Sequence, residues 1–374
     1  MKEVGLYIHI PFCKQKCNYC DFNSYVCNDD KIKSYIDALL KEIQMYIKEY
    51  GFIFETVFFG GGTPTFIHYK HIEAIMTVIN SYIAEAAEIS MECNPGTVST
   101  DSLSAYRAMG INRLSIGLQA WQRELQKQLG RIHDTEQFLL NLEQAREGGF
   151  TNISVDLMFA LPNQSLDMWM ETVEKVASLG VKHISCYSLK VEEGTPFYKL
   201  YQQEKLQLPE DELDRTMYHG AIERLKKYGL EQYEISNFAV PGFECKHNLI
   251  YWENKEYLGV GAGSHSKISG VRYNNYRGLE KYIEKINSNV YPIEEKNIIE
   301  NEEEMWETII LSLRLNKGLD IKEFNNKYKV DFIQKYCKAL NKLKNNRLVE
   351  LSDNCLKLTP LGSDLSNTVF IEFL

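Results

Sequence analysis

The chain has 374 residues, of which 44% are hydrophobic and 25% are charged, and its formal net charge at pH 7 is −9. This length suffices for two domains, or for one large domain with an appendage, and the apolar content excludes a disordered chain. The acidic balance argues against a general nucleic-acid binder, and no stretch reaches the roughly 18 apolar residues of a membrane span.

The cysteines and the first residues indicate a cytoplasmic protein. Nine cysteines are spread thinly along the chain, and six of them lie outside the short segment described below. Free thiols of this kind persist in reducing compartments. Residues 1–11 lack a signal-peptide pattern because His9 and Pro11 interrupt the apolar run. We therefore expect a cytoplasmic location without a transmembrane segment.

The first half of the chain alternates between short apolar strands and amphipathic helices. Strands are expected at 5–9, 56–59, 88–92, 112–118, 152–158 and 183–189. Helices are expected between them at 31–50, 69–82, 101–108, 135–147 and 167–179. Such alternation predicts a parallel sheet that right-handed crossovers curl into a barrel or an open relative of one. The predicted fold class is α/β, a partial (β/α)6 TIM-like barrel.

The last third of the chain reads as a smaller α+β domain that resembles a winged helix. Its elements are expected as helices at 302–313 and 332–345, then strands at 348–351 and 356–358. The acidic balance argues against DNA binding, so a substrate lid or a docking surface is the expected role. The chain is thus divided into a partial barrel at 1–230, a barrel extension at 231–295 and a C-terminal domain at 296–374.

Three closely spaced cysteines form the most informative pattern of the sequence. Cys13, Cys17 and Cys20 lie directly after the first predicted strand. Three thiolates so spaced can hold three irons of a [4Fe-4S] cubane, which leaves the fourth iron open to a small molecule. A disulfide framework would leave one of the three unpaired, and a zinc site normally needs a fourth nearby ligand. The spacing therefore favours an iron–sulfur cluster.

Polar residues follow the ends of several predicted strands. In parallel α/β barrels, functional groups gather at the C-terminal ends of the strands. Here those ends carry the cysteine segment, the glycine-rich turn 60–63, Glu92, Gln119 and Asp156. Arg131 follows a short helical segment after Gln119. We expect these groups to converge above one rim and to form a single site.

These motifs resemble the radical S-adenosylmethionine (SAM) superfamily, in which the open iron of the cluster chelates SAM. Segments 7–22, 60–64, 115–119 and 156–162 resemble the branch that holds anaerobic coproporphyrinogen III dehydrogenase (HemN-type) and the heme chaperones (HemW). The resemblance implies that Cys13, Cys17 and Cys20 ligate the [4Fe-4S] cluster. It also implies that SAM is surrounded by Tyr7, Tyr19, Gly61, Gly62, Thr63, Glu92, Gln119, Arg131 and Asp156.

Each of these residue types suits a part of SAM, and each also has an ordinary structural explanation. Glycines let backbone N–H and C=O groups approach a ligand closely. Arg131 can pair with the methionyl carboxylate, or it can form a common salt bridge on its helix. Glu92 and Asp156 can accept hydrogen bonds from the ribose or the ammonium, or they can cap the helices that follow them.

Two departures and one further motif separate the two branches. The dehydrogenase pattern has another cysteine two residues after the third, where this chain has Phe22, and the dehydrogenase has a longer segment before Tyr7. Residues 247–252 match the His-Asn-x-x-Tyr-Trp motif of the chaperone branch. The resemblance therefore implies a heme chaperone that passes heme to apo-hemoproteins, which can include respiratory, membrane-associated acceptors. The alternative is the dehydrogenase, which decarboxylates the propionates of coproporphyrinogen III.

The second motif offers chemistry that suits heme. Imidazole and phenolate are axial ligands of heme iron, so His247 and Tyr251 are candidates, and Trp252 can stack on the porphyrin face. His265 is a candidate for a second ligand. The structural alternative is a buried polar network that supports the glycine-rich segment 259–263. Both interpretations stay open from the sequence alone.

Overall fold

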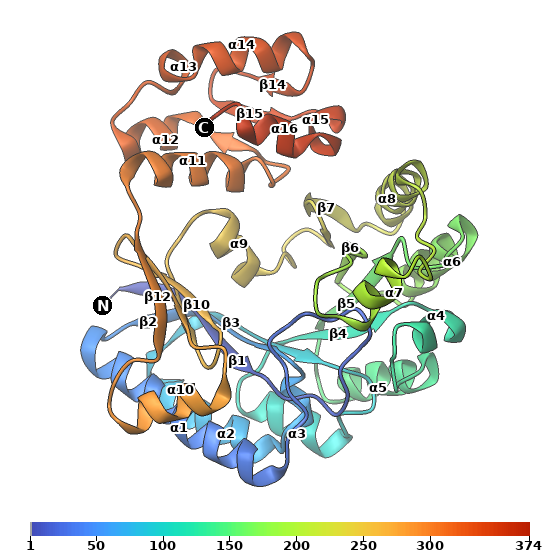
Figure 1. The fold of residues 1–374 in the computed structure, drawn as a ribbon, viewed down its shortest axis with the longest axis vertical. Coiled ribbons are helices and arrows are strands. Elements are labelled where there is room, and N and C mark those ends of the chain that lie inside the picture. The colour runs from blue at the N-terminus through green and yellow to red at the C-terminus, as the bar shows by residue number, and fades with distance from the viewer. Residues whose placement is uncertain (1) are drawn as a thin grey trace.

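The computed structural model describes residues 2–374 and contains one large and one small sheet (Figure 1). The large sheet has 12 strands in the order β12-β11-β10-β9-β1-β2-β3-β4-β5-β6-β8-β7. Strands β12 and β7 are its two edges, so this barrel-like sheet stays open. The small sheet has the order β13-β15-β14 and belongs to the C-terminal part of the chain.

Six parallel strands form the centre of the large sheet, each paired with the next in sequence. They are β1 (Glu3–Ile10), β2 (Ile53–Gly61), β3 (Ile83–Cys93), β4 (Arg113–Gln119), β5 (Asn152–Phe159) and β6 (His183–Ser188). The main connecting helices are α1 (Asp29–Tyr50), α2 (Tyr69–Ile79), α3 (Thr100–Ala108), α5 (Thr135–Glu147) and α6 (Leu166–Ser178). The predicted fold class, a partial barrel of six parallel strands with a smaller C-terminal domain, is confirmed.

Local sequence explains where these elements begin and end. Helix α1 begins after Asn28, whose side chain accepts a hydrogen bond from the Lys31 N–H, and it ends at Gly51 with a φ of 61°. Its buried face packs into the same hydrophobic core as β1, in which Leu6 and Ile8 are fully buried. The strands are apolar along most of their length because both of their faces are covered.

Further strands, most of them antiparallel to their neighbours, widen the sheet on both sides. Beyond β6 lie β8 (Asn237–Ala239) and β7 (Glu231–Glu234). On the other side, β9 (Tyr257–Val260) runs parallel to β1 and is followed by β10 (His265–Ile268), β11 (Val271–Asn275) and β12 (Ile293–Ile298). The intervening helices are α4 (Arg123–Gln128), α7 (Pro196–Gln202), α8 (Asp211–Lys226), α9 (Lys246–Trp252) and α10 (Leu279–Asn287). This arrangement brings residues 257–277 beside the loop that follows β1.

Glu42 on α1 fixes the connection between β9 and β10. Its fully buried carboxylate accepts hydrogen bonds from the Gly261 N–H at 2.7 Å, the Asn275 amide at 2.6 Å and the Tyr282 hydroxyl at 2.6 Å. Burial raises the pKa of Glu42 to about 7, although these three donors favour the charged form. One side chain thus joins α1 to the β9–β10 turn, to β11 and to α10.

The C-terminal domain has its own hydrophobic core and lies at the top of Figure 1. Its elements are α11 (Asn301–Ser312), β13 (Leu319–Asp320), α12 (Ile321–Tyr328), α13 (Phe332–Lys335), α14 (Cys337–Asn345), β14 (Val349–Leu351), β15 (Cys355–Leu358), α15 (Pro360–Asp364) and α16 (Ser366–Ile371). The predicted helix 332–345 is interrupted at Tyr336, which has a φ of −104° and a ψ of 21°. The Tyr336 ring packs against Phe332 and Phe373, and this contact accompanies the break. Across residues 2–374, no helix combines the length and the apolar character that crossing a bilayer requires.

The Glu42 network predicts a large loss of stability in a Glu42→Ala variant. The variant leaves three buried donors without their acceptor, so the free energy of unfolding should fall by about 2–4 kcal/mol. Urea denaturation followed by circular dichroism measures this change. Asp37→Ala, at an exposed position of the same helix, is the matched control and should change stability by less than about 0.5 kcal/mol. Equal effects of the two variants would contradict the role of the network.

Candidate functional site

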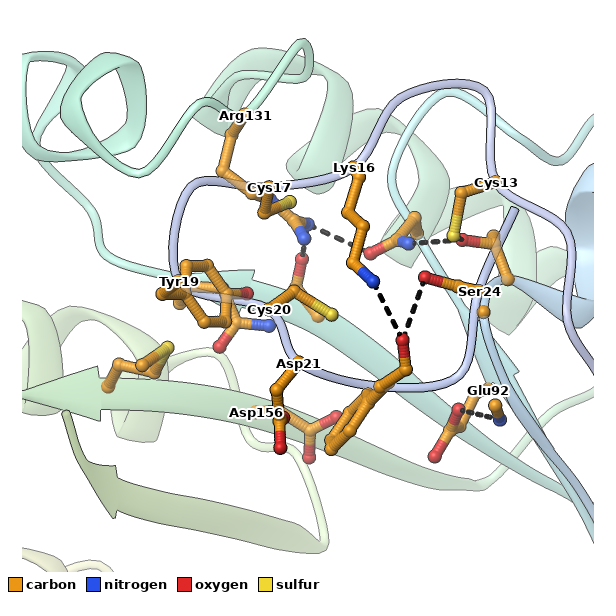
Figure 2. A pocket seen from close by; sticks show the side chains of 18 of the residues that line it. Cys13, Lys16, Cys17, Tyr19, Cys20, Asp21, Ser24, Glu92, Arg131 and Asp156 are labelled. Atoms are coloured by element: carbon orange, nitrogen blue, oxygen red, sulfur yellow. Dashed lines mark hydrogen bonds between the residues drawn. The ribbon is translucent and has the colours of Figure 1, made fainter. Parts of the chain in front are cut away.

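The loop after β1 carries the three cysteines and is closed by hydrogen bonds near its ends. The Cys13 N–H donates to the Tyr25 carbonyl at 3.0 Å, and the Tyr25 N–H donates to the Pro11 carbonyl at 2.7 Å. Lys16 donates across the loop to the Phe22 carbonyl at 2.9 Å. Figure 2 shows Cys13, Cys17 and Cys20 along this loop, above the strand ends that carry Glu92 and Asp156. We call residues 11–28 the cysteine loop.

The glycine-rich turn at the end of β2 holds the cysteine loop through backbone contacts. The Gly62 N–H donates to the Ile10 carbonyl, and the Thr63 N–H donates to the Phe12 carbonyl, both at 2.9 Å. A methyl group at Gly62 would lie 2.8 Å from the backbone of Phe12 and 3.0 Å from the Cys13 sulfur. Only glycine therefore allows this approach. The Thr63 hydroxyl lies 3.5 Å from the same sulfur.

A cavity of about 400 Å³ opens between the cysteine loop and the ends of β2 to β6. All three predicted cluster ligands line it. So do the residues that the resemblance places around SAM, apart from Tyr7: Tyr19, Gly61, Gly62, Thr63, Glu92, Gln119, Arg131 and Asp156. We call this space the cluster cavity. Residues from positions 13–156 thus lie around one cavity, as predicted from their places at the ends of parallel strands. Their individual roles stay predictions.

Two half-buried carboxyl residues, Glu92 and Asp156, line the cluster cavity. Burial, and then repulsion from Asp156, raise the pKa of Glu92 to about 8, although Glu92 accepts a hydrogen bond from the Gly61 N–H at 3.1 Å. Burial also raises the pKa of Asp156, whose two carboxylate oxygens both lie 3.1 Å from the Ser115 hydroxyl. Two carboxyl groups that resist ionisation together suit a ligand with hydroxyl groups and positive charge, and SAM carries both.

Arg131 and Gln119 also line the cluster cavity. Arg131 carries a charge without an ion-pair partner among the described residues, and Gln119 has a left-handed backbone conformation. The Arg131 guanidinium donates to the Asn94 side chain at 2.9 Å and to the Gly117 carbonyl, but within residues 2–374 it forms no ion pair. Its charge is thus available to a ligand carboxylate. Gln119 has a φ of 69°, a left-handed conformation that is uncommon for a residue with a side chain and is often found at functional sites.

Several residues of the cluster cavity were not assigned an individual role from the sequence. They are Asn94, Ser115, Gly117, Met158 and Tyr187. The sequence contained a signal for some of these residues. Residues two apart on a strand face the same side, so neighbours of Gln119 and Asp156 at this spacing should line the same cavity. Ser115 and Gly117 precede Gln119 at this spacing on β4, and Met158 follows Asp156 on β5. A methyl group at Gly117 would lie 2.9 Å from the Gln119 side chain, so this glycine makes room for Gln119.

Cys13 and Cys20 must lose their thiol protons before they can ligate a cluster. Over the described part of the chain, no three His, Cys, Asp or Glu side chains gather closely enough to hold one ion. The three thiolates of a cubane site bind different irons and need no common centre. Burial raises the pKa of Cys20 to about 11 and raises that of Cys13, so ligation must displace protons. In the structure all nine cysteines are free thiols.

A second cavity of about 460 Å³ adjoins the first. The two share Asp21, Phe22, Gly61 and Glu92. Phe22 is 62% exposed. The remaining wall includes Tyr7, His9, Tyr251, Tyr257, His265, Asn274 and Arg277. We call this space the aromatic cavity. Tyr7 therefore lies beside the predicted SAM site, on its second-cavity side.

His247, the first residue of the second motif, is buried with both ring nitrogens engaged. Its Nδ1 lies 2.7 Å from the Thr56 hydroxyl, and its Nε2 lies 2.8 Å from the Tyr251 hydroxyl. Burial lowers the pKa of His247 to about 3, so the ring is neutral at pH 7. An axial bond from His247 to heme iron would require one of these hydrogen bonds to break.

The other two aromatic residues of the motif point to different surroundings. Tyr251 reaches the wall of the aromatic cavity, where its ring packs edge-to-face on Tyr257 with centroids 4.7 Å apart. Trp252 lies beneath the guanidinium of Arg314, 5.4 Å from ring centre to Cζ, and so faces the C-terminal domain. The structure therefore does not bring His247, Tyr251 and Trp252 together around one ligand position.

Comparison with known proteins supports the same branch. Residues 7–176 match the Radical SAM superfamily, and residues 299–365 match the HemN C-terminal domain. The heme chaperone HemW of Bacillus subtilis (strain 168) is 38% identical to this chain, over 98% of each chain. The chain belongs to the HemW family of radical SAM proteins. The HemW of Lactococcus lactis subsp. lactis is 34% identical, over 100% of this chain and 98% of its own.

The fold is shared with a solved member of the neighbouring branch. The coproporphyrinogen III oxidase HemN of Escherichia coli, described as a radical SAM enzyme, superposes with a TM-score of 0.87. The two chains are 25% identical, and the match covers 100% of this chain and 90% of HemN. Membership of the radical SAM superfamily implies a [4Fe-4S] cluster and SAM, and the cysteine loop and the cluster cavity fit both.

The contact between the glycine turn and the cysteine loop can be tested with Gly62→Ala. The added methyl group cannot be accommodated without moving the backbone of Phe12, an overpacking cost of about 1–3 kcal/mol. We expect severalfold less iron per chain after anaerobic reconstitution, measured by iron content and by absorbance near 400 nm. Gly278→Ala places a methyl group in open space and is the control. Full iron loading of Gly62→Ala would show that the loop does not need this approach.

The raised pKa of Glu92 predicts that SAM affinity depends on pH. The carboxyl group is protonated below about pH 8 in the ligand-free protein, whereas the positive charge of SAM favours the ionised form. Binding then releases a proton, so affinity should rise with pH, by up to about tenfold per unit from pH 6 to 8, and then level off. Calorimetric SAM titrations of cluster-loaded protein measure this.

A Glu92→Gln variant separates this effect from the titration of SAM itself. Asp156 and Arg113 are the charged groups that act on Glu92, and both are retained in the variant. The variant should lose the pH dependence that Glu92 causes and keep that of the ligand and of Asp156. Identical pH profiles for the two proteins would exclude Glu92 as the titrating group.

Proposed function

We propose that this protein is a heme chaperone, which binds heme and passes it to apo-hemoproteins while it carries a [4Fe-4S] cluster and SAM. The observation that carries the proposal is the aromatic cavity, which adjoins the cluster cavity in a chain similar over its full length to proteins named heme chaperone HemW. Acceptors would be apo-hemoproteins, including respiratory and membrane-associated ones. The free thiols favour a reducing compartment such as the cytoplasm.

The chemistry of the aromatic cavity suits heme. Heme has a flat apolar face, an iron that binds nitrogen or oxygen ligands, and two propionates. The cavity offers aromatic rings at Phe22, Tyr251 and Tyr257, an imidazole at His265 and a guanidinium at Arg277. Its volume of about 460 Å³ lies within the range of small-molecule sites, roughly 300–1,000 Å³.

The residues of the cluster cavity would hold the cluster and SAM beside the proposed heme site. Cys13, Cys17 and Cys20 would hold the cluster, while Gly61 and Gly62 admit SAM and Arg131 orients its carboxylate. When bound, the cluster and SAM supply one-electron chemistry. In a chaperone, the cluster and SAM would serve heme loading or release instead of continuous turnover. Asp21 and Phe22 line both cavities and so connect the two sites.

The second candidate function is oxidative decarboxylation of coproporphyrinogen III. The TM-score of 0.87 with the E. coli coproporphyrinogen III oxidase HemN supports it. The differences at Phe22, and at the motif 247–252, favour the chaperone. Formation of protoporphyrinogen by the anaerobic, reduced protein would reverse this choice.

Heme transfer provides the direct test. Cluster-loaded protein is loaded with one equivalent of hemin under anaerobic conditions, and transfer to apomyoglobin is followed by the shift of the Soret band. We expect saturable binding of one heme per chain and transfer that falls about tenfold in Cys17→Ser, which lacks a cluster ligand. Cys337→Ser, at an exposed position of the C-terminal domain, is the control. Heme transfer that does not depend on Cys17 would contradict a role of the cluster in the chaperone function.

A further inference from the structure

Three histidines lie at or behind the wall of the aromatic cavity, and two of them have no free nitrogen. The Nδ1 of His9 lies 3.0 Å from the Tyr7 hydroxyl, and its Nε2 lies 2.8 Å from the Asn23 carbonyl. His247 uses both nitrogens in the same way, and both rings are buried. Neither ring can bind a metal without first giving up a hydrogen bond.

His265 differs from both. It is exposed at the start of β10, and across residues 2–374 its ring makes no hydrogen bond and no ion pair. A neutral imidazole with free nitrogens is the form that binds heme iron.

The backbone at His265 is held firmly. Its strand pairs with Asn274 on β11, and a methyl group at Gly259 would lie 2.1 Å from the His265 carbonyl oxygen. The turn before it is fixed by Glu42, which accepts from the Gly261 N–H. A ligand on such a rigid element keeps its geometry when the metal leaves and returns.

Arg277 supplies an available positive charge in the same cavity. Its guanidinium makes no ion pair or hydrogen bond with any described residue, in a chain whose net charge is −9. Its carbonyl accepts hydrogen bonds from the Asn23 amide at 3.1 Å and the Tyr25 hydroxyl at 3.0 Å, so the cysteine loop fixes its position. A planar guanidinium recognises a carboxylate with two parallel hydrogen bonds, and the heme propionates are carboxylates.

His247 then has a positioning role. It holds the hydroxyl of Tyr251, and Tyr251 packs edge-to-face on Tyr257, so the wall beside His265 is built from rings with fixed orientation. Tyr257 also lies on β9, which pairs with β10 through Lys267. His247 therefore shapes the aromatic cavity through Tyr251, without lining the cavity itself.

We propose that His265 is the axial ligand of heme iron in the aromatic cavity and that Arg277 binds a heme propionate, whereas His247 positions Tyr251. This assignment rests on the proposed function, because it requires that the protein binds heme. It extends that function by naming the iron ligand and the anion partner. Phe22, which both cavities share, would then lie beside the porphyrin and the SAM site together.

The test is an anaerobic hemin titration of the cluster-loaded full chain, followed by absorbance and by the EPR spectrum of the ferric heme. Variants are His265→Ala, Tyr251→Phe and Arg277→Gln, with His68→Ala and Arg347→Gln as controls at exposed positions in other parts of the molecule. We expect His265→Ala to weaken binding at least tenfold and to abolish the spectrum of histidine-ligated heme. Added imidazole should restore that spectrum. Arg277→Gln should raise the dissociation constant severalfold and leave the iron spectrum unchanged.

Each alternative outcome has a distinct meaning. An unchanged spectrum in His265→Ala overturns the assignment. A spectrum of tyrosine-ligated heme in the unmodified chain that is lost in Tyr251→Phe instead places the ligand at Tyr251. Absence of saturable heme binding in the unmodified chain refutes the proposed chaperone function itself. Because His265 is exposed, its replacement should not affect folding, and the melting temperature checks this.

Discussion

The backbone contact between the cysteine loop and the glycine turn is the constraint on which both cavities depend. Gly62 can approach Phe12 and the Cys13 sulfur only because it lacks a side chain. The loop it holds forms one wall of the cluster cavity and, through Asp21 and Phe22, one wall of the aromatic cavity. A change at this contact therefore reaches two binding spaces at once, which is the physical basis for expecting the cluster to influence heme binding.

The parallel core and the cluster cavity could be predicted because simple rules govern them. Strand–helix alternation specifies a parallel sheet, and strand ends then collect residues as distant in sequence as Cys13 and Asp156. The packing of β9 to β12 beside β1 could not be predicted in this way. These strands have four to six residues, and β11 is half-buried along most of its length, so its sequence lacks a clear alternation. The aromatic cavity depends on this packing and was therefore missed.

The motif at 247–252 shows why a sequence match does not specify a role. His247 and Tyr251 are one helical turn apart and share a hydrogen bond, whereas Trp252 lies on another face of α9 and contacts Arg314 beyond α11. Figure 1 shows α9 between the large sheet and the C-terminal domain. The short helix thus connects the core of the barrel, the aromatic cavity and the C-terminal domain.

The most direct measurement is the microwave power saturation of the EPR signal of the reduced cluster, with one equivalent of bound heme or of zinc protoporphyrin. Ferrous heme with one histidine ligand is paramagnetic, whereas zinc protoporphyrin is not. If heme occupies the aromatic cavity, its iron lies close enough to the cysteine loop to speed relaxation of the cluster spin. The half-saturation power should then rise with heme and stay constant with zinc protoporphyrin. Stoichiometric heme binding with unchanged saturation would place heme elsewhere and contradict the shared-wall arrangement.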